Sequence, residues 1–406
     1  MKSGSGISAA PVATPKVRMD WPDVAKGLSI LGVVLLHVSM AIPGGKDSFL
    51  AEVNHFLDPL RMPLFFLVSG FFSVKVLSMS FEQLFKRRLW FFLVPYLLWT
   101  PIELFFNRIE GLIYNDFSLP DVFYYVNKVF QGSNMYWFLF FLVWFNLLLW
   151  ATRKLPVWMI FTSALLIPWF FMPMFSDNEM LRKTLIYLPA FLVGAYFRPL
   201  ITRFAEAASR PKAVVIAVAF YVAGLGVAAA EDVLTTRTPG TYQLWLIALK
   251  DDIATLLGGE LSAFSMGHIS GMLIRLLSLP AGVVLAVWLA KLSPVARLLK
   301  FVGSHTMVIY LGHALGLTIL FGFTLKWEHM VIDNDSANPL HWTGTWMLIS
   351  FSLAMAGGYL MHLISKIPYL GWSLVPPKLP ETDQKITRKL SEPSATVSPE
   401  SLSMKS

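Results

Sequence analysis

The segment Asp20-Trp-Pro-Asp-Val-Ala-Lys-Gly-Leu-Ser-Ile-Leu-Gly-Val-Val-Leu-Leu-His37 shows most directly how this chain is built. It opens an apolar run from Val24 to Ile42 that is long enough to cross a bilayer as a helix. Two ionisable residues, Lys26 and His37, interrupt the run 11 residues apart, about three helical turns, which predicts one shared face and a separation of roughly 16 Å. Ionisable groups in lipid are costly unless they face protein or water. The stripe is therefore predicted to line an internal path.

The composition of the whole chain indicates a membrane protein. Of its 406 residues 55% are hydrophobic and only 14% are charged, which excludes an ordinary soluble domain and predicts an all-α, polytopic fold. The net charge of +8 comes from short basic clusters between apolar segments, so we expect contact with the bilayer and no nucleic-acid partner. Cysteine is absent, which excludes disulfides, thiolate catalysis and cysteine-based metal sites.

Apolar segments recur along the chain and predict ten transmembrane helices. Their approximate ranges are 24–42, 60–78, 88–107, 134–151, 156–174, 183–198, 212–230, 271–291, 301–323 and 343–366. The region 231–270 is ambiguous, and its piece 242–257 carries Lys250, Asp251 and Asp252 at its centre. We interpret that piece as an amphipathic segment in a long outer loop.

The basic residues predict the orientation, because loops rich in Lys and Arg remain in the cytoplasm. With the N-terminus inside, the inner loops hold Lys75, Lys86–Arg88, Arg153, Lys154, Arg198, Arg203, Arg210, Lys212, Lys291, Arg297 and Lys300. This pattern predicts a multi-pass protein of the cell (inner) membrane with both termini cytoplasmic. Residues 1–19 and 371–406 are polar and rich in small residues or proline, and are predicted to be disordered cytoplasmic ends around a membrane domain at 20–370.

His37 is the leading candidate for chemistry. With the predicted orientation it lies in the outer part of the first span, and a neutral imidazole is suited to taking a proton from a hydroxyl group. The alternative is a histidine that only hydrogen-bonds a neighbouring helix. The alignment of Lys26 on the same face favours the functional interpretation.

The cluster Lys86-Arg87-Arg88 stands at the predicted cytoplasmic start of the third span. One interpretation is orientation alone, because basic side chains at an inner helix end reach the lipid headgroups. The other is that the three cations bind the phosphates of a cytoplasmic ligand. The residues by themselves favour the first interpretation.

Four further residues could belong to the functional site or could have only structural roles. Arg61 could hold an acceptor or stabilise an oxyanion, or it could simply pair with Asp58 three residues earlier. Glu103, inside the third span, is a functional candidate for which a structural ion pair is nearly as good an explanation. Ser69-Gly70 is more typical of close helix packing than of a nucleophile.

The ninth predicted span contains His313, and His305 precedes it by eight residues. That spacing turns the two side chains about 80° apart around a helix, so they need not share a site. It also lacks the i,i+4 pair and third ligand of a zinc site, and we predict no metal.

Several short motifs appear in order along the chain. They are Lys26-x10-His37, Met62-Pro-Leu-Phe-Phe-Leu-Val-Ser-Gly70, Val94-Pro-Tyr96, Tyr136-Trp-Phe-Leu139, Leu188-Pro-Ala-Phe-Leu-Val-Gly194 and Val308-Ile-Tyr-Leu-Gly-His313. Together they resemble the acyltransferase-3 family of membrane O-acyltransferases. The lysine of the first motif is similar to the fucose O-acetylase-like branch, where Lys stands at the position of the family's Arg.

This resemblance implies transfer of an acyl group, usually acetyl, from cytoplasmic acetyl-CoA to a hydroxyl of an extracytoplasmic glycan or glycolipid. It implies that His37 is the general base, that Lys26 helps to position the donor, and that Lys86–Arg88 meet the CoA phosphates. It also raises Arg61 and His313 as site residues. Family members often carry another Arg shortly before the proline of the third span, and Trp90–Val94 contains none.

Two other classes of protein fit parts of the pattern. In a secondary transporter or flippase, Lys26, His37 and Glu103 would relay protons or contact the substrate. Such proteins commonly show internal repeats and paired broken helices, and the sequence shows neither. In a non-catalytic membrane scaffold, the same polar residues would only lock helices together.

Overall fold

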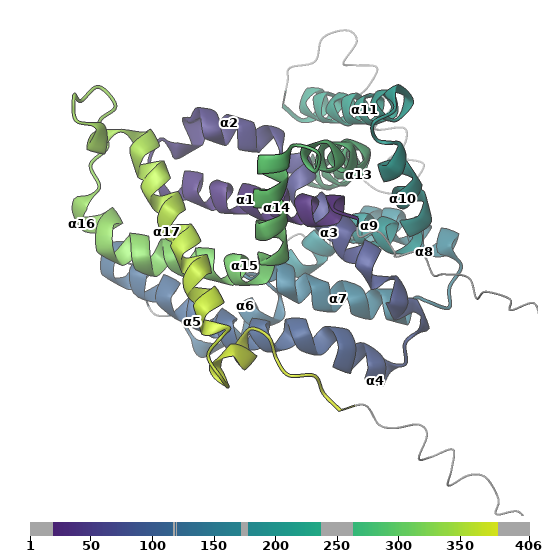
Figure 1. Cartoon of the computed structure of the whole chain (residues 1–406), viewed down its shortest axis with the longest axis horizontal. Helices are drawn as coiled ribbons and strands as arrows, with labels where there is room; N and C mark the ends of the chain where they lie inside the picture. Colours follow the sequence, from purple (N-terminus) through teal and green to yellow (C-terminus); the bar gives the residue numbers. More distant parts are fainter. Residues whose placement is uncertain (1–18, 117, 119, 172–177, 237–262, 381–406) are drawn as a thin grey trace, which may run out of the picture.

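The computed structural model describes residues 19–116, 118, 120–171, 178–236 and 263–380, and the regular secondary structure of these ranges is entirely helical (Figure 1). The helices are α1 (Trp21–Ala41), α2 (Phe49–Phe56), α3 (Asp58–Ser73), α4 (Phe81–Leu84), α5 (Trp90–Tyr114), α6 (Val122–Phe130), α7 (Trp137–Ala151), α8 (Val157–Phe171), α9 (Glu179–Tyr196), α10 (Arg198–Ala207), α11 (Pro211–Thr236), α13 (Ala263–Leu289), α14 (Ser293–Ser304), α15 (Thr306–Leu315), α16 (Trp327–His329) and α17 (Thr343–Ile364). Two π-helical stretches, η3 (Phe85–Leu89) and η5 (Gly316–Lys326), continue into α5 and α16. The predicted N-terminal segment up to residue 18, the predicted amphipathic piece 242–257 and the tail beyond 380 lie outside the described residues.

The all-α, multi-pass membrane character is confirmed, but the predicted number of ten spans is not. Among the described residues, seven helices are long and apolar enough to cross a bilayer, or eight if α9 and α10, bent by 82°, form one broken span. The two remaining predicted spans correspond to α7 and α8, which have 15 residues each. At 1.5 Å per residue such a helix is about 22 Å long, shorter than a hydrocarbon core of roughly 30 Å. Apolar content predicted these segments correctly as helices, but it could not predict where each helix ends.

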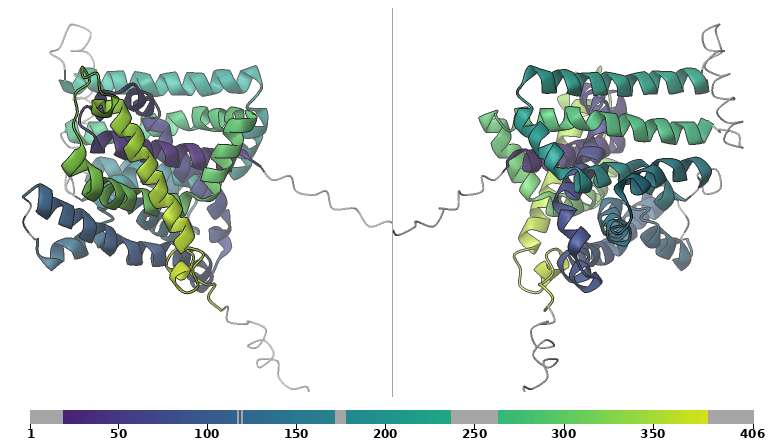
Figure 2. Two further views of the ribbon diagram at one scale, coloured as in Figure 1. Left: turned by 60° about the vertical axis from the view of Figure 1, so that its left-hand side comes forward. Right: turned by 90° about the vertical axis from the view of Figure 1, so that its right-hand side faces the viewer.

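The first helix lies in the interior of the bundle. It packs against α3, α13, α14, α15 and α17, and its residues Val24, Ile30, Val34 and Val38 are completely buried (Figure 2). Pro22 stands in its first turn, where the missing N–H of proline costs no hydrogen bond. The segment that carries the predicted chemistry is thus surrounded by other helices.

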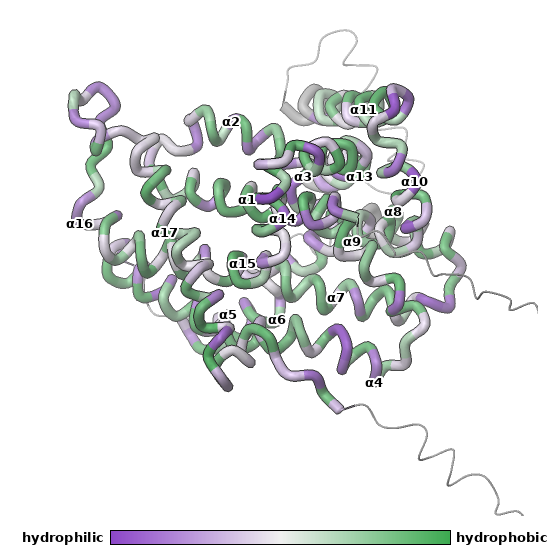
Figure 3. The backbone as a smooth tube through the Cα atoms, in the orientation of Figure 1, coloured by the Kyte–Doolittle hydropathy of each residue, from purple (hydrophilic) through white to green (hydrophobic). Residues whose placement is uncertain are grey.

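The apolar side chains that remain exposed lie on the outer helices. α11 runs beside α13 at one edge of the molecule and exposes Val215, Val218 and Val222. Figure 3 shows hydrophobic residues along most of the helices and hydrophilic residues mainly at helix ends and connections. In a bilayer this outer apolar surface contacts lipid.

The pair Ser69-Gly70 brings α3 and α9 into close contact, as predicted. A Cβ atom on Gly70 would lie 1.9 Å from the carbonyl oxygen of Phe191, and one on Gly194 would lie 2.0 Å from that of Leu67. The Ser69 hydroxyl donates to the Phe65 carbonyl oxygen at 2.8 Å within its own helix. Small residues on both helices let the two backbones touch.

The chain after α17 returns along α5. The indole nitrogen of Trp90 donates to the carbonyl oxygen of Pro377 at 3.0 Å, and that of Trp99 donates to the Ser373 hydroxyl at 3.3 Å. The predicted disordered tail begins at residue 371, and its first part, 371–380, therefore packs against a membrane helix. Indole N–H groups on the surface of α5 require acceptors, and this segment supplies them.

Candidate active site

His37 lies on the wall of a cavity of about 250 Å3 between α1, α5 and η5. Polar and apolar side chains both line the cavity. The lining residues are His37, Met40, Ala41, Glu110, Met135, Leu317, Thr318, Phe321 and Lys326. The His37 side chain is therefore not sealed in an apolar core. Its imidazole faces a space large enough for a small ligand.

His313 of α15 joins His37 at this site. It is completely buried, and the centroids of the two imidazole rings are 5.2 Å apart. Its Nδ1 lies 3.2 Å from the Ile309 carbonyl oxygen, an acceptor, so Nδ1 carries the proton and Nε2 of the neutral ring is an acceptor. Nδ1 of His37 and Nε2 of His313 are both buried without a hydrogen-bond partner. Unpaired buried nitrogens are uncommon and mark a site that a substrate, a water or a movement completes.

The two histidines of the α14–α15 region are separated, as their spacing predicted. His305 contacts His362 of α17, with ring centroids 5.0 Å apart, and its ring is tilted against that of Phe301. His313 instead contacts His37 of α1.

Glu103 is not among the residues that line the cavity. It is 5% exposed, accepts a hydrogen bond from the backbone N–H of Met135, and leaves Oε2 without a partner. The hydroxyl of Tyr310 donates to the Met135 carbonyl oxygen at 2.8 Å, and the Tyr310 and His313 rings are 5.8 Å apart. A chain of contacts through Met135 and Tyr310 therefore connects the carboxyl group to the histidine pair.

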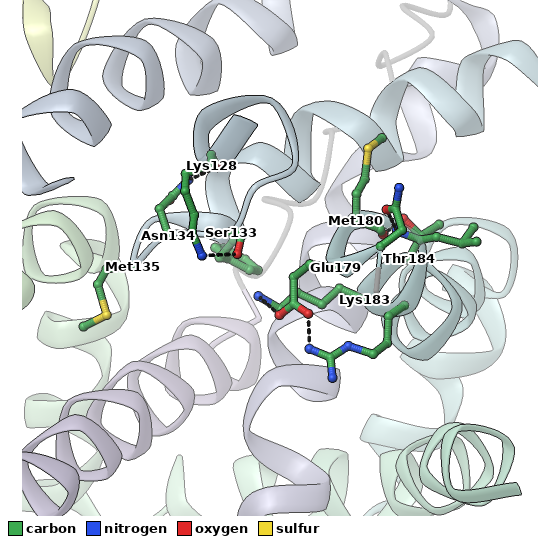
Figure 4. Close-up of polar contacts among 12 residues, drawn as sticks. Lys128, Ser133, Asn134, Met135, Glu179, Met180, Lys183 and Thr184 are labelled. Atoms are coloured by element: carbon green, nitrogen blue, oxygen red, sulfur yellow. Dashed lines mark hydrogen bonds and ion pairs between the residues drawn. The ribbon is translucent and has the colours of Figure 1, made fainter. Parts of the chain in front are cut away.

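The loop before α7 holds Met135 in place. Lys128 Nζ donates to the Ser133 hydroxyl at 3.2 Å, and the side-chain amide of Asn134 donates to the Tyr96 hydroxyl at 2.9 Å. Figure 4 shows Lys128, Ser133 and Asn134 together on one side of the loop and the Met135 side chain on the other. The loop thus presents an apolar side chain to the cavity.

Arg61 occupies a second, larger cavity next to the first. It is 7% exposed, pairs with Asp58 at 2.6 Å as one interpretation predicted, and also donates to the Asn54 side chain at 3.1 Å. The cavity has a volume of about 540 Å3 and is lined by Leu36, Ser39, Met40, Lys46, Ala51, Glu52, Asn54, His55, Asp58 and Arg61. Met40 lines both cavities. Arg61 is therefore near the His37 cavity without being part of its wall.

At the other end of α1, Lys26 lies close to the predicted basic cluster. Its ammonium group pairs with Asp23 at 2.8 Å and lies 6.0 Å from the centroid of the Phe72 ring. The guanidinium of Arg88 donates to the carbonyl oxygen of that same Phe72. Phe72, at the end of α3, therefore lies beside both Lys26 and Arg88, which are 62 positions apart in the sequence.

The other members of the basic cluster differ in their surroundings. Lys86 is bound by Glu82 and by the carbonyl oxygen of Pro380, each at 2.6 Å, and Arg87 is exposed. All three sit on the π-helical turn η3, a distortion that is frequent at functional sites. Arg198 adds a further cation, 4.8 Å from the Phe71 ring.

The predicted open path along the stripe from Lys26 to His37 is wrong for this conformation. Ile30 and Val33, which lie on the stripe between them, are 0% and 6% exposed and belong to the apolar core. The structure therefore shows two polar sites at opposite ends of α1, separated by packed side chains.

Sequence reasoning missed two charged residues of the His37 cavity, Glu110 and Lys326. Glu110 follows the recognised Glu103 by seven residues, a spacing that returns to the same face of α5. This spacing is the sequence feature that could have identified Glu110 as a site residue. Lys326 gave no such signal, because it follows the predicted ninth span and only the path of η5 brings it back to the cavity.

A family model matches most of the chain. Residues 19–363 match the family Acyl_transf_3, described as an acyltransferase domain, and the match includes every helix that contributes to the two sites. No curated protein and no solved structure matches the chain. An acyltransferase is an enzyme, so the family match favours catalysis over transport or a scaffold as the function of the chain. The chain belongs to the acyltransferase-3 family of membrane-bound acyltransferases.

Proposed function

We propose that this enzyme transfers an acetyl group from cytoplasmic acetyl-CoA to a hydroxyl group of an extracytoplasmic glycan or glycolipid. One observation carries the proposal: the two ends of α1 carry different functional groups, imidazoles at one end and cationic side chains at the other. One end has a histidine pair, of which His313 is completely buried, beside a cavity, and the other has Lys26 next to the cationic turn η3. Acetyl-CoA is anionic and confined to the cytoplasm, whereas surface glycans lie outside. An enzyme that joins them needs a cationic inner site and a base near the outer side.

In the proposed reaction His37 is the general base. It removes the proton from the acceptor hydroxyl as that oxygen attacks the thioester carbonyl carbon, and a tetrahedral intermediate forms. When the C–S bond breaks, the protonated His37 returns its proton to the leaving thiolate, giving CoA and the acetyl ester. We assign His313 to positioning the base, because its ring centroid lies 5.2 Å from that of His37 and its unpaired Nε2 can accept a hydrogen bond from the Nδ1–H of His37.

Three of the predicted site residues have supporting roles in this proposal. Glu103 and Tyr310 fix the backbone of Met135, and with it the wall of the cavity. Arg61 is a buried cation next to the cavity, and we assign it to the acceptor or to the developing oxyanion. His313 stays a positioning residue and not a substrate ligand, because it is completely buried.

The donor site lies at the other end of α1. Lys86, Arg87 and Arg88 bind the CoA phosphates, and Lys26 positions the pantetheine arm where it enters the bundle. Ile30 and Val33 fill the face of α1 between Lys26 and His37. The pantetheine arm therefore reaches His37 only if these side chains move when the donor binds.

Removal of two exposed or half-exposed charges tests the donor site. We expect Lys86→Gln combined with Arg87→Gln to weaken acetyl-CoA binding about tenfold at low salt, because two cations near the phosphates are lost. The effect should shrink as ionic strength rises. Isothermal titration of the purified protein measures it, with Lys212→Gln at the start of α11 as a matched control. An unchanged donor affinity would show that the cluster serves membrane orientation only.

The function itself is tested by supplying the purified protein with radiolabelled acetyl-CoA and an extract of envelope glycolipids. Transfer of label to a glycolipid, in an alkali-labile ester, is the expected result. Label that stays in acetyl-CoA with every acceptor, together with substrate flux in reconstituted vesicles, would contradict the proposal.

A further inference from the structure

The wall of the His37 cavity carries two charged residues that the proposed reaction does not use. Glu110 of α5 and Lys326 of η5 line the cavity, with side chains 14% and 22% exposed. We propose that this pair is the acceptor-binding subsite and that the acceptor group it takes is a neutral sugar ring. The inference rests on the proposed function, since it identifies the substrate class of the same site.

The Glu110 carboxylate is held in a fixed position. The indole nitrogen of Trp327 donates to its Oε1 at 2.9 Å, and the Trp327 ring stacks on Tyr114 at 5.0 Å with an interplanar angle of 6°. A Cβ atom on Gly322 would lie 3.0 Å from the same Oε1, so the carboxylate rests against the backbone of η5, where a larger residue would push it aside by a few tenths of an ångström. A group fixed in this way binds a ligand without first losing side-chain freedom.

The ion pair between these residues is loose enough to admit a ligand. Lys326 Nζ and Glu110 Oε1 are 3.9 Å apart, compared with 2.8 Å between Lys26 and Asp23 at the other end of the protein. An ammonium group has three donors and a carboxylate has several acceptor positions, so both keep hydrogen-bonding capacity. A sugar hydroxyl matches this arrangement, because it donates to the carboxylate and accepts from the ammonium group.

The charge and size of the cavity favour one neutral ring. Glu110 and Lys326 have opposite charges, and these are the charged side chains of the lining, so an anionic ligand gains no net attraction. The rest of the wall includes the apolar side chains of Met40, Met135 and Leu317, which suit the C–H groups of a sugar ring. A volume of about 250 Å3 lies just below the roughly 300–1,000 Å3 of sites for drug-sized ligands, which fits a single ring with a hydroxyl at His37.

Binding of simple sugars tests the subsite without turnover. The probes are methyl glycosides of glucose, galactose and fucose, and methyl glucuronide as an anionic counterpart, detected by saturation-transfer NMR on the full-length protein in nanodiscs. We expect at least one neutral glycoside to bind more tightly than the glucuronide. Glu110→Gln should weaken that binding at least fivefold, although glutamine still accepts from Trp327. Glu328→Gln, an exposed residue one position beyond Trp327, should leave it unchanged.

A second variant distinguishes the effect of the position of the Glu110 carboxylate from the effect of its charge. Gly322→Ala keeps both charges but displaces the Glu110 carboxylate, so it should also weaken glycoside binding and raise the acceptor KM more than it lowers kcat. Acetyl-CoA affinity, measured on the same samples, should stay at the wild-type value and so exclude a folding defect.

The outcomes distinguish this inference from the proposed function. Wild-type protein that binds no neutral glycoside, tighter binding of the glucuronide, or glycoside binding that Glu110→Gln and Gly322→Ala leave unchanged would each overturn the subsite. Acetyl transfer to glycolipids that persists in such a case would leave the proposed function intact. Glycoside binding that depends on Glu110, in a protein that transfers no acetyl group, would support the subsite and overturn the proposed function.

Discussion

His37→Ala should lower the rate of acetyl transfer by about 10^3-fold, because a positioned general base contributes roughly 10^2- to 10^4-fold to a reaction rate. The side chain lies at the cavity wall with a buried partner, His313, and no other histidine lines that cavity within the described residues. The affinity for acetyl-CoA should not change, since the proposed donor phosphates bind at the other end of α1. Single-turnover transfer of radiolabel from acetyl-CoA to glycolipid measures the effect.

The control for this variant is His329→Ala, which removes an exposed imidazole just beyond the cavity residue Lys326. It should retain full activity. Equal transfer by the wild type and by His37→Ala would remove His37 from the mechanism, whatever the control shows.

Gly70→Ala should destabilise the protein by about 2 kcal/mol or more, because overpacking a close contact costs about 1–3 kcal/mol. The new Cβ atom would lie 1.9 Å from the carbonyl oxygen of Phe191 and 3.1 Å from the Ala195 backbone nitrogen. Both are backbone atoms, so α3 and α9 must separate along their contact. Thermal unfolding of the detergent-solubilised protein measures the loss as a lowered Tm.

The matched control is Gly226→Ala in α11, where a Cβ atom would have no neighbour within 4 Å. This variant should unfold at or slightly above the wild-type temperature, since alanine favours a helix over glycine. If both variants unfold at the same temperature, the contact between α3 and α9 is not as close as described.

The sequence predicted the parts of the site that lie on one helix. The spacing of Lys26 and His37, the ion pair Arg61–Asp58 and the packing role of Ser69-Gly70 all depend on local helical geometry, and the structure contains each of them. Apolar periodicity also predicted the helices themselves.

Contacts between helices could not be predicted in the same way. His313 meets His37 only because α15 packs against α1, and Lys326 reaches the cavity only through the π-helical η5. The open stripe was predicted from the cost of burying charge, but Ile30 and Val33 fill it. Polarity shows where a helix needs protein or water, and it does not show which side chains from other helices occupy the space.

The orientation of the two ends decides whether the proposed chemistry is possible, and the absence of cysteine makes it measurable. A single cysteine at Asp335, in the connection that leads to Thr343 beside Gly44, would report the His37 end, and one at Lys212 would report the Lys26 end. A membrane-impermeant thiol reagent then selects proteoliposomes in which the Lys26 end faces outward.

With radiolabelled acetyl-CoA added outside these vesicles and glycolipid acceptor sealed inside, the most direct measurement is the side on which labelled ester forms. Our account predicts label on the acceptor inside, at the His37 end, and none with His37→Ala. Label that forms only when donor and acceptor are supplied on the same side of the membrane would contradict it.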